Sequence, residues 1–215
     1  ELKKPGIYKL NFSNFKTFYK DDGSFFNKAS STEKGINKTY KKIELNNTFH
    51  IFIKSDNITI DGGDNLIYFN LNNNISNTID QGENLHVLQN SLIIDDLTED
   101  AGHDNIVIKN FEIFMTNFVE KEEGCGILVS KNFGKQRNEF GNVIKECIVH
   151  CNSLSESGGS IVGSNAGENG KLIISDCVFF GQSNKNQTQL RKLGNGGIAG
   201  SYLGTNGGNI LINNC

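Results

Sequence analysis

Short runs of alternating apolar and polar residues recur along most of this 215-residue chain. The first clear runs are 50–53, 57–61 and 66–69, and further runs, mostly three to five residues long, follow as far as 210–212. Alternation with a period of two residues is typical of β-strands that bury one face. No segment keeps the 3.6-residue period of a helix. The pattern therefore predicts an all-β protein built from many short strands.

A four-residue motif, in which an isoleucine is followed three positions later by Phe or Cys, repeats at intervals of 36, 30 and 38 residues. The isoleucines are Ile108, Ile144, Ile174 and Ile212, and their partners are Phe111, Cys147, Cys177 and Cys215. A second motif, at 127–130, 161–164 and 198–201, lies between them at intervals of 34 and 37 residues. Self-similarity at ~20–50 residues marks repeat architectures whose units stack on one another.

The repeat favours a solenoid over a β-sandwich or a propeller. A propeller blade would need about ten more residues in each period, with a hairpin between successive strands. Parallel strands stack ~4.8 Å apart, so equivalent side chains of successive coils align. We therefore expect the four isoleucines to form one inward column and the Phe and Cys residues to form a second. The fold predicted is a right-handed parallel β-helix over 49–215, with about five coils, that continues beyond residue 215.

Residues 1–48 do not fit the repeat and are predicted to form an N-terminal β cap and loop. Strand-like alternation begins near Gly6, and an aromatic-rich stretch follows it. Its members are Phe15, Phe18, Tyr19, Phe25 and Phe26. A stacked solenoid needs an atypical terminal unit over its open end, and aromatic side chains are suited to that role.

The composition agrees with a turn-rich β-protein and excludes several classes of function. The chain has 24 glycines, one proline and 36% hydrophobic residues. Its net charge is −3, and it has no basic stripe of the kind that nucleic-acid binding requires. No run approaches the ~18 apolar residues of a membrane span. No Gly-Lys-Ser/Thr follows the glycine pairs at 158–159 and 207–208, so no phosphate-binding loop or other cofactor site is predicted.

The five cysteines read as reduced thiols rather than as a disulfide framework. Cys147, Cys177 and Cys215 occupy the same repeat position as Phe111, which suits small apolar side chains in a core. Cys147, His150 and Cys151 lie close in sequence, but zinc would need a second ligand pair that the chain does not supply. We therefore expect no metal at these residues.

Two glycine-rich segments carry a resemblance to known proteins. Residues 158–165 followed by 172–177, and 196–201 followed by 210–215, resemble the "GLUG" type of β-helix repeat. The segment 58–63, Ile-Thr-Ile-Asp-Gly-Gly, is similar to an early coil of right-handed parallel β-helices of the pectate-lyase-like superfamily. The resemblance covers roughly residues 50–215. Repeats of this kind occur in bacterial surface proteins and in large DNA viruses, so it implies a fold rather than an activity.

The densest group of ionisable residues lies at 95–104. It contains Asp95, Asp96, Glu99, Asp100, His103 and Asp104. Paired carboxylates with a histidine can carry out glycoside hydrolysis. In particular, Asp95, Asp96, His103 and Asp104 loosely resemble two of the three motifs of polygalacturonases of this fold. Asp96 and His103 are only seven residues apart, too close for successive coils, and the third motif is absent because 143–145 lacks an arginine. An exposed acidic loop between strands is the simpler interpretation.

The same loop offers a second, weaker alternative. Hard cations bind clustered carboxylates, so Asp95, Asp96, Glu99 and Asp100 are candidate calcium ligands. No glycine-aspartate repeat accompanies them. The primary expectation is therefore no metal and no catalytic residue.

These observations predict a non-catalytic structural module of a larger assembly. The missing catalytic set, the repeat and the ends of the chain together point to a capsid or surface component of a large DNA virus. The expected partners are other structural proteins or further coils of the same chain, and the expected location is a virion or a cell surface. Two alternatives stay open: a carbohydrate-active β-helix enzyme, and a cell-surface adhesin that binds glycans without cleaving them.

Overall fold

The computed structural model describes residues 1–9, 42–46, 50–63, 66–70, 78–79, 86–87, 91–95, 101–115, 124–136, 139–151, 154, 157–181 and 197–215. Within these ranges the protein is all-β and contains no helix, as the alternating pattern predicts. Consequently, no helix of the described part is long and apolar enough to cross a membrane.

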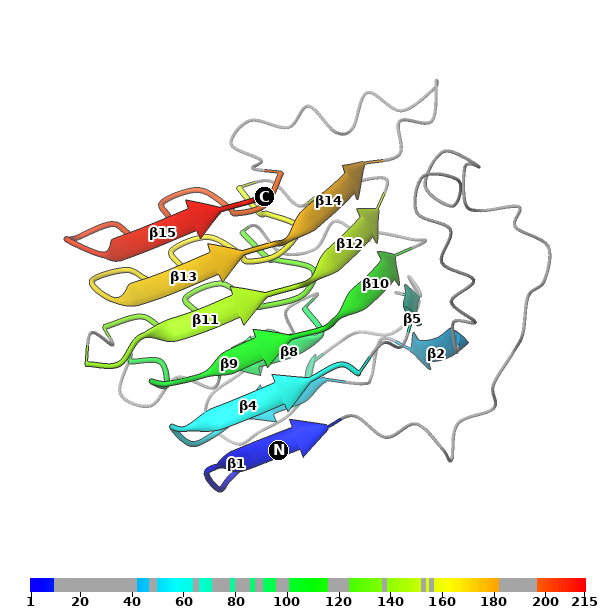
Figure 1. Ribbon diagram of the computed structural model, residues 1–215, viewed down its shortest axis with the longest axis horizontal. Coiled ribbons are helices and arrows are strands. Elements are labelled where there is room, and N and C mark those ends of the chain that lie inside the picture. The colour runs from blue at the N-terminus through cyan, green and yellow to red at the C-terminus, as the bar shows by residue number, and fades with distance from the viewer. Residues whose placement is uncertain are drawn as a thin grey trace.

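Two parallel sheets hold most of the strands (Figure 1). The six-stranded sheet contains, in spatial order, β1 (Gly6–Lys9), β4 (Ile58–Asp61), β9 (Val107–Lys109), β11 (Asn142–Lys145), β13 (Lys171–Ser175) and β15 (Asn209–Asn213). The five-stranded sheet contains β2 (Lys42–Asn46), β5 (Leu66–Asn70), β10 (Glu112–Met115), β12 (Ile148–Cys151) and β14 (Val178–Gly181). Each strand pairs with strands of the preceding and following coils, so the chain advances by one strand spacing per turn.

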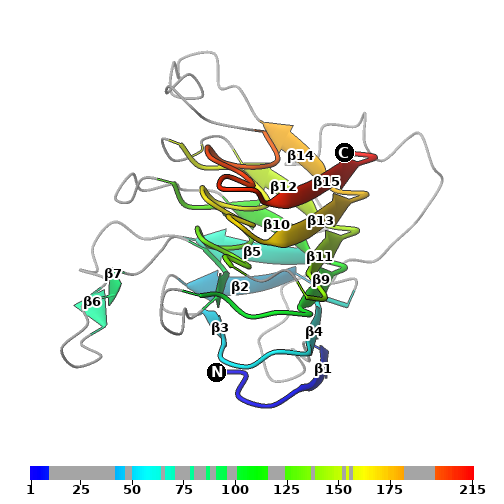
Figure 2. The same cartoon turned by 90° about the vertical axis from the view of Figure 1, so that its left-hand side faces the viewer.

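A third, thinner face completes each coil. β3 (Ile51–Ile53) pairs with β8 (Ile93–Asp95), and single parallel bridges continue this face through Val129, Val162 and Ala199. A separate antiparallel pair, β6 (Thr78–Ile79) and β7 (His86–Val87), lies outside the stack (Figure 2). The three stacked faces make the protein a parallel β-solenoid, with β1 at one end and β15 at the other.

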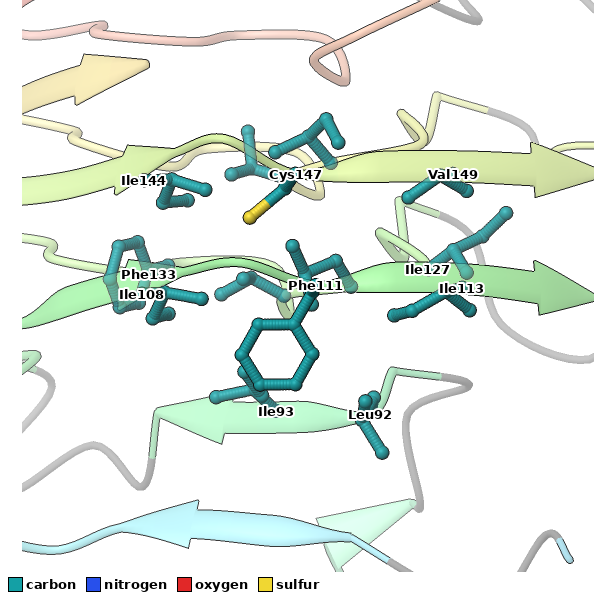
Figure 3. Packing of buried hydrophobic residues seen from close by; sticks show 14 of the residues in the cluster. Leu92, Ile93, Ile108, Phe111, Ile113, Ile127, Phe133, Ile144, Cys147 and Val149 are labelled. Carbon is teal, nitrogen blue, oxygen red and sulfur yellow. The ribbon is translucent and has the colours of Figure 1, made fainter. Parts of the chain in front are cut away.

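The interior is built from the two predicted columns of side chains. Ile108, Ile144 and Ile174 are directly in register and have no exposed surface. Phe111, Cys147 and Cys177 form the second column and are at most 1% exposed (Figure 3). Burial of such a side chain contributes ~1.5–3 kcal/mol. The last members, Ile212 and Cys215, are exposed because β15 is the terminal strand of its sheet, and the predicted register is otherwise confirmed.

The corner between the two main sheets consists of only two residues in each coil. Its first residue is Asn110, Glu146, Asp176 or Asn214, with φ between 51° and 58°. This left-handed conformation turns the chain sharply, and Asn and Asp tolerate it better than most residues. The second residue is the Phe or Cys of the buried column, so the corner directs that side chain inward.

On the third face the structure corrects the alignment of the second repeat. Val129 pairs with Val162, at an interval of 33 residues rather than the predicted 34. Both Ile127 N and Leu128 N donate to Ser160 O, at 3.2 and 3.1 Å. Two residues therefore oppose one, as in a β-bulge. The next interval agrees with the prediction, because Val162 pairs with Ala199.

The described parts of residues 1–48 join the same sheets as the repeat. β1 pairs in parallel with β4, and β2 pairs in parallel with β5. The aromatic stretch from Phe15 to Phe26, which carries the predicted cap, lies outside the described residues. The division of the chain at residue 48 therefore stays a prediction.

Candidate functional site

Asp95, the last residue of β8, is the centre of a buried polar cluster. Its side chain has no exposed surface, contrary to the expectation of an exposed acidic loop. Its carboxylate accepts hydrogen bonds from His103 N at 3.2 Å, from Gly134 N at 3.0 Å and from His103 Nδ1 at 2.7 Å. Its own backbone N donates to Ser130 Oγ at 3.2 Å. One carboxylate thus connects two segments of neighbouring coils.

His103 lies in the same coil as Asp95, just before β9, as the short sequence separation predicts. Its side chain is 8% exposed. Donation from Nδ1 to the carboxylate fixes the ring and leaves Nε2 as the acceptor nitrogen. No described residue forms a hydrogen bond with Nε2. The Asp95–His103 pair therefore has the form of an oriented general base.

Asp104 follows His103 but has different partners. Its Oδ1 accepts from Asn105 N at 2.9 Å and from Gly141 N at 2.7 Å, and its Oδ2 accepts from Phe140 N at 3.0 Å. Asp104 N donates to Asp56 Oδ1 at 2.8 Å. Asp104 is 7% exposed and ties together segments of three successive coils.

Asn142 is a member of the cluster that the sequence analysis missed. It is fully buried in β11, in the column where β13 has Leu172. Its Oδ1 accepts from Ile106 N at 2.8 Å, and its Nδ2 donates to His103 O at 2.9 Å. The signal that could have revealed it is an amide at a repeat position that elsewhere carries an aliphatic residue.

Two glycines allow the loops of the cluster to approach closely. A Cβ on Gly102 would lie 2.5 Å from Asp95 Oδ2 and 2.9 Å from Gly134 N, so no side chain fits there. Gly134 has a φ of 65°, which L-residues rarely adopt, and its N–H points at Asp95. The Gly102-His103 sequence is thus explained by packing against the carboxylate.

Not all of the predicted site residues are brought together. Asp95 and His103 are in direct contact, and Asp104 is their neighbour with separate partners. Asp96, Glu99 and Asp100 lie outside the described residues, so both the second carboxylate of the catalytic alternative and most of the calcium ligands stay predictions. Within the described ranges, no group of three His, Cys, Asp or Glu side chains is placed to hold a metal ion.

A second histidine lies on the outward side of the five-stranded sheet. His150 is stacked between Phe114 and Phe180, with ring centroids 5.4 and 4.9 Å apart. Its Nε2 is 3.0 Å from Glu112 Oε1. The neighbours Ile113 and Val149 belong to the core, so the alternation of side chains places this stack on the opposite face. The three rings repeat from coil to coil like the inner columns, and Phe180 is 43% exposed.

Comparison of the chain with protein-family models, curated proteins and solved structures finds no match. The argument about function therefore depends on the geometry of this protein alone.

Proposed function

We propose that this protein is a non-catalytic structural module, a right-handed parallel β-helix whose N-terminal end is closed by the aromatic-rich segment of residues 10–41. In this proposal the solenoid is a rigid spacer and docking element of a larger assembly. The resemblance of its repeats to those of large DNA viruses and bacterial surface proteins supports a place in a virion, as a capsid or surface component, or at a cell surface.

The use made of the two buried carboxylates is the observation that carries this proposal. Asp95 accepts hydrogen bonds from two backbone N–H groups and a histidine, and Asp104 accepts three from backbone N–H groups. Carboxylates engaged in this way fix loops between coils. Neither of them has an oxygen that faces a substrate site, which a general acid or a nucleophile of glycoside hydrolysis would need.

A screen for depolymerisation of acidic polysaccharides tests the absence of catalysis. We expect no release of reducing or unsaturated ends by the wild-type chain. Activity that disappears in Asp96→Asn or His103→Gln while the fold is retained would contradict the proposal.

A carbohydrate-active enzyme is the alternative that one observation favours. His103 is oriented by Asp95, and its Nε2 has no described hydrogen-bond partner, as in a general base. Base catalysis would show as activity that rises as the imidazole loses its proton and that His103→Gln removes. An adhesin that binds glycans without cleaving them would instead retain glycans in an array without consuming them.

The partner surface that we propose is the end of the solenoid formed by β15. Leu211 and Ile212 are 51% and 43% exposed, and Tyr202 is 69% exposed. An exposed strand edge with apolar side chains is a template for pairing with another chain. This end suits docking against a structural protein or against further coils.

Sedimentation velocity over a range of concentrations tests this surface on the 215-residue chain. We expect self-association that Ile212→Lys abolishes, because a charge at a strand edge opposes pairing. The matched variant Ile7→Lys, at the opposite end where Ile7 is 79% exposed, should leave the association unchanged. A wild-type chain that stays monomeric at high concentration would contradict the proposed surface.

A further inference from the structure

Three cysteines follow one another along the second inner column. Cys147, Cys177 and Cys215 occupy the same corner position in successive coils, because Ile144, Ile174 and Ile212 are in register. All five cysteines of the chain are described, and none forms a disulfide. The proposed structural role of the solenoid makes no use of a column of thiols, so its chemistry calls for its own explanation.

The three side chains have equivalent orientations. Each Sγ lies close to the carbonyl oxygen two residues before it: Cys147 at 3.1 Å from Lys145 O, Cys177 at 3.2 Å from Ser175 O and Cys215 at 3.1 Å from Asn213 O. Cys177 and Cys215 also approach the carbonyl oxygen of the isoleucine one coil below, at 3.9 and 3.8 Å. The sulfur atoms therefore repeat with the rise of the solenoid.

The Cys177 thiol contacts both neighbouring thiols. A hydrogen bond from the Cys147 thiol lowers the pKa of Cys177, whereas burial raises the pKa of Cys147 well above its ordinary value. The middle sulfur is thus the one that most readily becomes a thiolate. Cys147 is its donor on one side, and Cys215 lies on the other side at the exposed end of the column.

The spacing of the sulfur atoms suits a bridging cation better than a disulfide. Equivalent side chains of parallel strands lie ~4.8 Å apart. Two metal–thiolate bonds of ~2.3 Å in a straight line span nearly the same length. A disulfide would instead need its Cβ atoms to close to ~3.8 Å, which the sheet spacing opposes. Zinc prefers four ligands, and the described residues offer no such set here.

We propose that Cys177 and Cys215 form a two-coordinate site for a soft monovalent cation, with Cu(I) as its representative. Thiolates select soft cations of this kind. Binding exchanges two S–H bonds for two S–Cu bonds and releases two protons to solvent, while copper stays Cu(I) and no oxidant takes part. Cys147 is a positioning residue that donates a hydrogen bond to the Cys177 sulfur. The exposed Cys215 gives the cation its entry.

An anaerobic titration of the reduced 215-residue chain with Cu(I), supplied as its acetonitrile complex, tests this site. Binding is followed by thiolate-to-copper absorption and by native mass spectrometry, and its affinity is measured against a competing chelator. We expect one Cu(I) per chain and two protons released per Cu(I). Cys215→Ala should weaken binding by more than ~100-fold, and Cys147→Ala, which alters only the second shell, by ~10-fold.

Cys125→Ala is the matched control, because it also removes one buried thiol but lies outside the column. It should keep the wild-type stoichiometry and affinity. Cys215 is exposed, so Cys215→Ala should keep the fold, which circular dichroism checks. Undiminished binding in Cys215→Ala, or an equal loss in Cys125→Ala, overturns the proposal. So does a wild-type chain that ignores Cu(I) and instead forms a Cys177–Cys215 disulfide with glutathione disulfide.

Discussion

At the scale of single residues, the polar groups of the interior hold neighbouring coils together. Asp95 and Asp104 accept hydrogen bonds from loops that lie more than 30 residues later in the chain. Asn142 takes a place in an aliphatic column and satisfies Ile106 N and His103 O. Buried backbone groups that have no strand partner need such acceptors and donors, because leaving them unpaired costs ~1–3 kcal/mol each.

Removal of the Asp95 carboxylate should therefore destabilise the protein strongly. Asp95→Ala leaves His103 N, His103 Nδ1 and Gly134 N without their acceptor. We expect a loss of ~3 kcal/mol or more in the free energy of unfolding, measured with urea. Glu139→Ala, which removes a carboxylate from an exposed position, should change it by less than ~0.5 kcal/mol. Equal effects of the two variants would show that the cluster does not hold the coils together.

Asp61 gives the protein a pH dependence on the acid side. Burial opposes its charge, but hydrogen bonds from Asn110 Nδ2 and Gly63 N, together with Lys109, hold the pKa of this carboxyl below its ordinary 3.8. The unfolded chain therefore binds the proton first as the pH falls. The stabilisation from Asp61 is complete above about pH 4 and is lost as the pH falls through the lowered pKa.

Urea unfolding at pH 6 and pH 3 tests this dependence. Asp61→Asn has no carboxyl to titrate, while its amide oxygen can still accept the same hydrogen bonds. The variant should lose less stability between the two pH values than the wild type loses. Identical losses would mean that Asp61 does not contribute to the acid sensitivity.

At the scale of elements, the inward columns could be predicted because a parallel stack repeats the same side chain at the same place in each coil. The Asp95–His103 contact could also be predicted as a candidate, since both residues lie in one coil. The donors at Gly134, Phe140 and Gly141 could not, because they come from the next coil. The bulge at Ile127 and Leu128 was missed as well, since a single extra residue in one coil leaves no mark on the local pattern.

The two-residue corners offer a test of conformational strain. Glu146 has a φ of 55°, where a residue with a Cβ is disfavoured by ~1 kcal/mol. Glu146→Gly should therefore stabilise the protein by ~0.5 kcal/mol, after the greater entropy of glycine in the unfolded chain is subtracted. Lys145→Gly, one residue earlier in β11, should destabilise by ~0.5–1 kcal/mol, because a strand gains nothing from glycine. Thermal melts of the two variants should shift in opposite directions.

At the scale of the whole molecule, each coil contacts only the coils above and below it, so stability is close to a sum over neighbouring pairs. The sequence predicted this architecture from the interval of its repeats. It could not predict that β1 and β2 pair with the first full coil, because their residues lack the Ile-x-x-Phe/Cys motif and lie on either side of a long intervening segment.

The position of a residue along the solenoid should therefore set the cost of its loss. Ile144 and Ile212 have the same place in their coils, yet Ile144 has no exposed surface and Ile212 is 43% exposed. Ile144→Ala leaves a cavity between two coils and should cost ~3–4 kcal/mol, whereas Ile212→Ala should cost less than ~1.5 kcal/mol. Hydrogen exchange gives the matching readout, because Ile144→Ala should speed exchange in β9, β11 and β13 together. Ile212→Ala should affect only β15 and its neighbour β13, since the coils beyond them do not contact the changed side chain.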